Sequence, residues 1–178
     1  MQRTILIYGA ISGAVVIGAI GAGLALAGGE PGAASSSMLV GYLIMIVAFS
    51  TIFIAIKRHR DREPGGSIGF VAAVGMGLGI SAVAGVVYVA VWEIYLSLTD
   101  YAFIGQYADA MIAAAKAAGT TGAELDRVVA EMDQMKTQYA DPLVRLPMTF
   151  LEIFPVGVVI ALVSAALLRN PKFMPARV

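Results

Sequence analysis

Apolar residues gather in four long stretches that are separated by polar segments. The stretches cover residues 4–27, 38–56, 68–98 and 147–168. A helix needs roughly 20 apolar residues to cross a hydrocarbon core about 30 Å thick, and each stretch is near or above that length. The pattern predicts an all-α integral membrane protein in which residues 1–178 form a single membrane domain with four transmembrane helices.

Residues 99–141 form the longest polar segment, and apolar side chains recur in it at helical spacing. This spacing predicts a helical hairpin outside the membrane, between the third and fourth spans. Gly119 is a natural stop for its first helix. Thr121 and Glu124 have the spacing of a capping box that would begin the second. Asp141, followed by Pro142, would cap and open the next helix.

The third apolar stretch is longer than a span requires. Ser67 is a good N-cap for it. A helix over residues 68–98 would be about 46 Å long at about 1.5 Å per residue, which exceeds the hydrocarbon core. We therefore expect this helix to tilt or to project from the membrane, with the hairpin continuing it.

The composition supports a membrane protein and removes several function classes. Hydrophobic residues make up 59% of the chain and charged residues 13%, with a mean hydropathy of +0.83. Soluble domains carry about 45–50% apolar and about 25% charged residues. The chain has no cysteine, which excludes disulfides, thiolate metal sites and a cysteine nucleophile. It has a single histidine, His59. We expect no enzyme activity and no cofactor, and the zero net charge argues against nucleic acid as a partner.

The basic residues are unevenly distributed and predict the topology. Lys57, Arg58, Arg60 and Arg62 follow the second span directly. Together with Arg3 and three basic residues in the tail, they account for eight of the twelve lysines and arginines, all on one side of a four-span topology. The positive-inside rule places that side in the cytoplasm. We expect a multi-pass protein of a bacterial inner membrane with both termini cytoplasmic.

One alternative concerns the first span. Arg3, an apolar stretch and the small-residue run Ala25-Leu26-Ala27 together resemble a secretory signal peptide. The apolar run is longer than the hydrophobic region of such peptides, so we expect a retained transmembrane helix.

Small residues recur every four positions in the first and third spans. The third span carries Gly69, Gly77 and Gly85 in one row, and a second G-x-x-x-G pair is formed by Gly75 and Gly79. The first span carries another such pair, Gly9 and Gly13. Small residues let helix backbones approach closely in lipid. The rows predict that the first and third spans pack together within one chain, and a homodimer seam is the alternative.

Each of the last two spans contains one acid. Glu93 lies five residues before the end of the third span, and Glu152 lies five residues after the start of the fourth, so the topology places both at similar depth. A carboxylate in an apolar span costs about 2.5–3.5 kcal/mol at the helix centre and is a candidate functional group. Pro155 frees a backbone carbonyl beside Glu152. Together these groups suggest a small cation or proton pathway that uses the acid pair.

The alternative gives the acids a structural role. Trp92 and Tyr95 fit an aromatic belt at the membrane interface. The two carboxylates could hydrogen-bond to tyrosines, to Thr149 or to Arg145, and simply fix the register of the helices. We favour this second interpretation, a non-enzymatic structural or partner-binding protein. Its partners would be the lipid bilayer and a membrane protein or a second copy of the chain.

Several short motifs resemble an uncharacterised family of bacterial membrane proteins known as domain of unknown function 4199. The resemblance covers Thr4 to Arg169, and the paired Glu-Ile motifs are its most specific part. It implies a four-span inner-membrane protein with a long loop between spans three and four, and it implies no activity, substrate or catalytic residue. The motifs that carry it are Tyr8-Gly9-x-x-Ser12-Gly13, Gly41-Tyr42, Ala48-Phe49-Ser50, Ile56-Lys57-Arg58, Tyr88-x-x-x-Trp92-Glu93-Ile94-Tyr95 and Thr149-Phe150-Leu151-Glu152-Ile153-Phe154-Pro155-Val156-Gly157.

Overall fold

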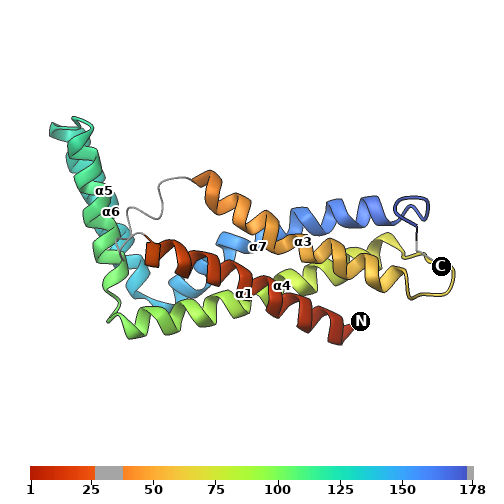
Figure 1. The fold of residues 1–178 in the computed structure, drawn as a ribbon. Helices are drawn as coiled ribbons and strands as arrows, with labels where there is room; N and C mark the ends of the chain where they lie inside the picture. The colour runs from red at the N-terminus through yellow and green to blue at the C-terminus, as the bar shows by residue number, and fades with distance from the viewer. Residues whose placement is uncertain (27–37, 176–178) are drawn as a thin grey trace.

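The computed structural model describes residues 1–26 and 38–175, and within these residues all regular structure is helical. In chain order the helices are α1 (Gln2–Leu26), α3 (Met38–Arg60), α4 (Phe70–Leu98), α5 (Ala102–Ala117), α6 (Gly122–Ala140) and α7 (Pro142–Leu168). Helices α1, α3, α4 and α7 run roughly along one common direction, and α5 and α6 stand steeply across one end of them (Figure 1).

The prediction of four long apolar helices is confirmed. Helices α1, α3, α4 and α7 are long and apolar enough to cross a membrane by length and composition. Some boundaries differ from those of the predicted spans. Helix α3 continues past Ile56 through the basic residues to Arg60, and α4 begins at Phe70 rather than at residue 68. Helix α7 begins at Pro142, as the Asp141-Pro142 pair predicted, and therefore starts before the apolar stretch 147–168. The polar loop that follows Ala27 lies in the residues 27–37, outside the described part of the chain.

The chain ends and the connection between α3 and α4 lie at one end of the bundle, and α5 and α6 lie at the other (Figure 1). We call these the terminal end and the α5–α6 end. The basic cluster of residues 57–62 is therefore at the same end as Met1 and the tail, in agreement with the predicted even number of crossings.

Helix α4 is the centre of the bundle and packs against α1 on one side and α7 on the other. Its contact with α1 is made through glycines of α1. A Cβ atom on Gly9 would lie 2.5 Å from the Val83 Cβ, and one on Gly13 would lie 2.9 Å from the Val87 Cβ. Real Cβ atoms do not approach so closely, so these positions require glycine. The prediction that the first and third spans pack together within the chain is confirmed.

Three of the five predicted glycines of α4 also lie at helix contacts. A Cβ on Gly77 would lie 2.5 Å from the Ala161 Cβ on α7, and one on Gly85 would meet the Phe150 ring at the same distance. A Cβ on Gly79 would lie 3.1 Å from the side chain of Ile5 on α1. These glycines let α4 approach neighbours on two faces.

The other two predicted packing glycines are corrected by the structure. Among the described residues, a Cβ on Gly69 or Gly75 would have nothing within 4 Å, so neither glycine lies at a contact between the described helices. Gly69 instead occupies the N-cap position of α4, and Gly75 points away from both neighbouring helices. Small residues recur every four positions in this part of the chain, but only some of them lie at contacts between helices.

Two of the predicted caps are also corrected. The N-cap of α4 is Gly69 and not Ser67, and no side chain caps that helix. Thr121 does occupy the N-cap of α6, but its side chain accepts no capping hydrogen bond. The Asp141 cap of α7 is confirmed, since its Oδ1 accepts a hydrogen bond of 2.9 Å from the Leu143 backbone N–H.

The chain turns sharply between α4 and α5, so the expectation that α5 continues α4 is wrong. Asp100 and Tyr101 have φ values of 50° and 56°, in the left-handed region that non-glycine residues seldom adopt. The Tyr101 N–H donates to the Leu96 carbonyl at 2.8 Å, which closes the end of α4. Helices α5 and α6 then lie side by side across the bundle end (Figure 1). Their connection includes Gly119, whose φ of 87° agrees with the predicted stop.

At the terminal end, a buried arginine joins α3 to the tail. The Arg60 side chain has no exposed surface, although the basic cluster was expected to set topology from outside the apolar span. Its Nη1 donates to the Phe173 carbonyl at 2.9 Å and its Nη2 to the Met174 carbonyl at 2.6 Å. Asp61 accepts from the same guanidinium and from Lys57, and the Lys57 hydrogen bond lowers the pKa of the Asp61 carboxyl. Arg60 thus fixes the tail against α3.

The contact at Gly77 gives a first prediction. The change Gly77→Ala should destabilise the bundle by about 1–3 kcal/mol, because the added Cβ would overlap the Cβ and the backbone of Ala161. The matched control is Gly75→Ala, which adds the same atom in open space two residues earlier. Alanine favours a helix over glycine by about 0.5–1 kcal/mol, so this control should be neutral or slightly stabilising. Unfolding by denaturing detergent, followed by circular dichroism, measures both, and equal losses would contradict the packing.

Candidate functional site

An ion pair joins Glu93 of α4 to Arg145 of α7. Arg145 Nε donates to Glu93 Oε1 at 2.7 Å, and Arg145 Nη2 donates to Glu93 Oε2 at 2.8 Å. This is the two-bond fork geometry in which arginine binds carboxylates best. Arg145 can reach Glu93 because α7 begins at Pro142, so that Arg145 lies in the first turn of the helix, facing the last turns of α4.

The rest of the Arg145 guanidinium is enclosed by tyrosines. Its Nη1 donates to the backbone carbonyl of Tyr139 at 2.8 Å, and its Cζ lies 5.0 Å from the centre of the Tyr101 ring and 5.8 Å from that of Tyr139. These distances allow cation–π attraction. Only 4% of Arg145 is exposed, so its charge depends on Glu93 and these rings. One side chain therefore connects α4, the turn before α5, the end of α6, and α7.

The aromatic residues beside this ion pair form a second cluster. Trp92 Nε1 donates to the Tyr139 hydroxyl at 2.7 Å. The Trp92 ring stacks on Tyr95 with centres 5.2 Å apart, and the edge of Phe103 meets it at 4.9 Å. Burial raises the pKa of the Tyr139 phenol, which keeps this hydroxyl protonated. The cluster fixes α5 and α6 against the end of α4.

Glu152 lies on a different part of α7 and has a different partner. Its Oε2 accepts a hydrogen bond of 3.3 Å from the hydroxyl of Tyr88, which is buried on α4. Glu152 itself is exposed at the surface of the chain, and within the described residues it forms no ion pair. Thr149, one turn earlier on α7, is 1% exposed, and its Oγ1 has no hydrogen-bond partner in the described part of the chain.

The two acids therefore have separate partners, a cation for Glu93 and a hydroxyl for Glu152. Residues 1–26 and 38–175 contain no group of three or more histidine, cysteine, aspartate or glutamate residues arranged to hold a metal ion. Pro155 lies inside α7, which continues through it to Leu168. Glu93 thus accepts from Arg145, and Glu152 accepts from Tyr88, each across the contact between α4 and α7.

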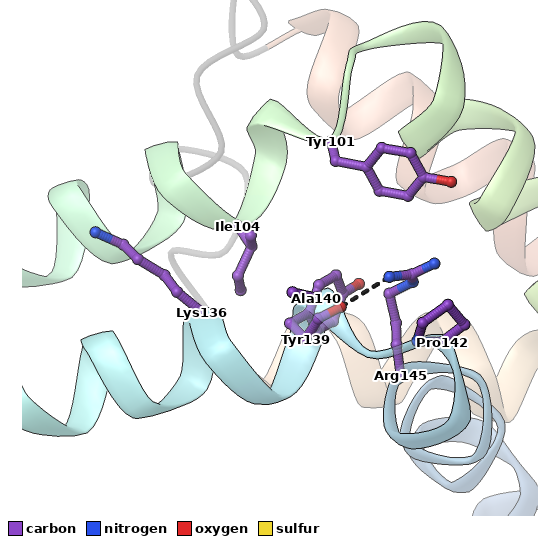
Figure 2. Close-up of a pocket in the computed structure, with 7 residues that line it drawn as sticks. All are labelled: Tyr101, Ile104, Lys136, Tyr139, Ala140, Pro142 and Arg145. Carbon is purple, nitrogen blue, oxygen red and sulfur yellow. Dashed lines mark hydrogen bonds between the residues drawn. The ribbon is translucent and has the colours of Figure 1, made fainter.

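A cavity of about 330 Å³ lies next to the ion pair, where α5 and α6 meet the bundle. Figure 2 shows Tyr101 above it, Ile104 and Lys136 on one side, and Pro142 and Arg145 on the other. Tyr139 and Ala140 complete the lining. The Lys136 ammonium points toward α5, where it lies 3.5 Å from Asp109. The cavity combines apolar walls with two cationic side chains.

Sequence reasoning singled out Glu93, Trp92 and Tyr95, but it did not identify their main partners as a site. Arg145 was assigned to the long polar segment and was only one of several partners considered for the acids. Tyr139 lies in the polar segment 99–141, where only its helical spacing was noted. The signal that could have joined them is the spacing of Arg145 from Pro142, because a helix that begins at Pro142 must carry Arg145 in its first turn.

The model of the family described as Protein of unknown function (DUF4199) matches residues 6–170 of the chain. No curated protein and no solved structure matches it.

The ion pair gives a second prediction. The change Arg145→Gln should cost about 3–5 kcal/mol of stability, because it leaves the Glu93 carboxylate largely buried without a cation. In the double variant, Glu93→Gln removes the unpaired carboxylate and should restore part of that stability. The loss of stability in the double variant should therefore be smaller than the sum of the losses in Arg145→Gln and Glu93→Gln. Thermal unfolding in detergent measures all three variants.

The control for these variants is Arg127→Gln. Arg127 pairs with Glu131 on α6 at 2.9 Å, but both side chains are more than half exposed. Exposed pairs contribute about 0–1 kcal/mol, so this change should have little effect. If the stability losses of Arg145→Gln and Glu93→Gln simply added in the double variant, the ion pair would contribute no coupling energy.

Proposed function

The chain belongs to the DUF4199 family, and we propose that it is a non-enzymatic integral membrane protein that crosses the bilayer four times and binds a partner outside it. In this proposal the membrane is the inner membrane of a bacterium, both termini are cytoplasmic, and the function requires no cofactor and no nucleic acid. The buried ion pair and the aromatic cluster hold the α5–α6 pair in a fixed position for that partner.

The outward-facing apolar side chains of the four long helices carry the proposal. Large hydrophobic residues are exposed all along the bundle, with Val71 at 84%, Val47 at 65% and Leu43 and Val159 at 60%. In the most apolar part of each long helix, only 22–39% of residues are buried within the chain. Soluble monomers rarely expose apolar patches of more than a few hundred Å². Lipid tails would cover this surface, and the helical backbone satisfies its own hydrogen bonds there.

The proposed orientation follows from the charge at the two ends. The basic cluster Lys57, Arg58, Arg60 and Arg62 is at the terminal end, together with Arg3. Basic loops are retained in the cytoplasm. The α5–α6 end would then face the opposite side of the membrane.

The α5–α6 pair offers the surface for a partner. Ala108 is the only buried residue of α5, and Tyr139 is the only one of α6, so nearly all the surface of the pair is open. Acids outnumber basic residues on these two helices: Asp109, Glu124, Asp126, Glu131 and Asp133 against Lys116, Arg127 and Lys136. A partner with a basic surface, or a second copy presenting its own basic residues, suits this surface.

A second candidate function is a cation or proton pathway, and Glu152 favours it. The Glu152 carboxylate has only the Tyr88 hydroxyl as a partner among the described residues, and the unpartnered Thr149 hydroxyl lies one turn away. An acid at membrane depth is usually protonated, paired or bound to a cation. Glu93 contributes less to such a pathway, because Arg145 already neutralises it.

The topology gives a third prediction. The chain has no cysteine, so single cysteines can be introduced without background. In sealed inverted and right-side-out vesicles, Arg62→Cys should react with an impermeant maleimide from the cytoplasmic face, and Lys116→Cys on α5 only from the opposite face. Lys172→Cys in the tail is the matched control and should behave as Arg62→Cys does. Labelling of Arg62→Cys and Lys172→Cys from different faces would refute the four-span topology.

A fourth prediction separates the two candidate functions. In sealed liposomes the protein should carry no proton or sodium flux above that of empty liposomes, and Glu152→Gln should only lower its thermal stability, through the weakened contact with Tyr88. Glu124→Gln, an exposed acid on α6, is the control and should leave stability unchanged. A flux that Glu152→Gln abolishes while the protein still folds would favour the pathway over the partner-binding function.

A further inference from the structure

The cavity at the α5–α6 end lies at a defined height along the bundle. Helix α4 has 29 residues and α7 has 27, so they are about 43 Å and 40 Å long at about 1.5 Å per residue. A bilayer with its headgroups is about 40–45 Å thick. The residues that line the cavity follow the end of α4 directly or surround the start of α7. In a four-span topology, the cavity is therefore at the level of the lipid phosphates.

The cavity wall offers donors to an anion at this level. Both terminal nitrogens of the Arg145 guanidinium carry a second N–H, since each uses one N–H in a bond to Tyr139 or Glu93. The positive charge of Arg145 is balanced by Glu93, so a second cation is needed to attract an anion. Lys136 supplies it: its side chain lines the cavity, and among the residues the structure describes its ammonium pairs with Asp109 at 3.5 Å and Asp133 at 3.7 Å.

The contacts of Lys136 with these aspartates are weak enough to exchange. Both carboxylates are more than 60% exposed, and ion pairs with exposed partners contribute about 0–1 kcal/mol. A lysine ammonium on its flexible stem can turn from α5 toward the cavity when a stronger anion is present. Ile104, Ala140 and Pro142 add apolar wall beside the two lining tyrosines, and this wall suits the glycerol and upper acyl carbons of a lipid.

We propose that this cavity binds the phosphate group of a membrane phospholipid, with Lys136 and Arg145 as its donors. The volume of about 330 Å³ is at the lower end of the roughly 300–1,000 Å³ typical of small-molecule sites, which suits a headgroup rather than a whole lipid. The site rests on the proposed membrane insertion. A lipid bound there would join α5, α6 and α7 in the headgroup layer and would stabilise the position of the α5–α6 pair.

Trp92 provides a reporter for this site. It is the only tryptophan of the chain, and its indole N–H donates to the hydroxyl of Tyr139, which lines the cavity. Binding in the cavity that moves Tyr139 should therefore change the emission of Trp92. The experiment titrates the purified full chain in a nonionic detergent with dihexanoyl phosphatidylglycerol and follows the emission of Trp92. Parallel titrations use inorganic phosphate and dihexanoylglycerol, which has the same acyl chains and no phosphate.

Phosphatidylglycerol should produce a saturable change that dihexanoylglycerol does not. Lys136→Gln should weaken its binding about tenfold, as expected for one lost hydrogen bond to a charged group. Lys116→Gln is the matched control, because Lys116 is exposed on the same helix pair and does not line the cavity. It should bind as the unaltered chain does.

Three outcomes would overturn the proposal: no saturable change, equal binding by Lys136→Gln and Lys116→Gln, or inorganic phosphate binding as tightly as the lipid, which would assign the site to free phosphate. Flotation of the same chain with liposomes separates these results from a failure of the proposed function. A chain that floats with liposomes but fails the titration is a membrane protein without this lipid site. A chain that does not float contradicts the membrane insertion itself.

Discussion

Helix α4 packs closely between α1 and α7 because glycines occupy the positions where the helix backbones approach most closely. Gly9 and Gly13 of α1 face Val83 and Val87 of α4, and Gly77 of α4 faces Ala161 of α7. Close approach strengthens the van der Waals attraction between the helices, which falls off steeply with distance. A single Cβ at any of these positions would separate the backbones and remove much of that attraction.

This close packing determines where the polar groups meet. With α4 held against α7, Glu93 comes opposite Arg145, and Tyr88 comes opposite Glu152. Each acid in an apolar helix thereby obtains a hydrogen-bond donor from the helix next to it. Such contacts are specific in register, because a shift by one turn would leave a carboxylate and a guanidinium without partners. The glycines thus supply the attraction, and the polar pairs select one alignment of the helices.

The two ends of the bundle are fixed by buried arginines in different ways. At the terminal end, Arg60 binds backbone carbonyls of the tail, and at the α5–α6 end, Arg145 binds Glu93 and the Tyr139 carbonyl. Arginine can do both because its planar guanidinium donates in several directions at once. Two residues that carry the family resemblance also make polar contacts between helices: the Tyr8 hydroxyl accepts from Arg58, and Trp92 donates to the Tyr139 hydroxyl.

The sequence by itself determined the helices, because run length, hydropathy and turn residues act locally. It predicted the four long apolar helices, the stop at Gly119 and the Asp141 cap, and it predicted that α1 and α4 pack together. The tertiary structure decided which of the small residues are used: Gly69 shares a row with Gly77, and Gly75 pairs with Gly79, but neither Gly69 nor Gly75 has a described neighbour where its Cβ would lie. It also decided that α5 turns away from α4, through two left-handed residues with no glycine to signal them. Above all, it paired Glu93 with Arg145 across 52 positions of sequence. Such a pairing depends on the relative rotation and height of two helices, which no local pattern encodes.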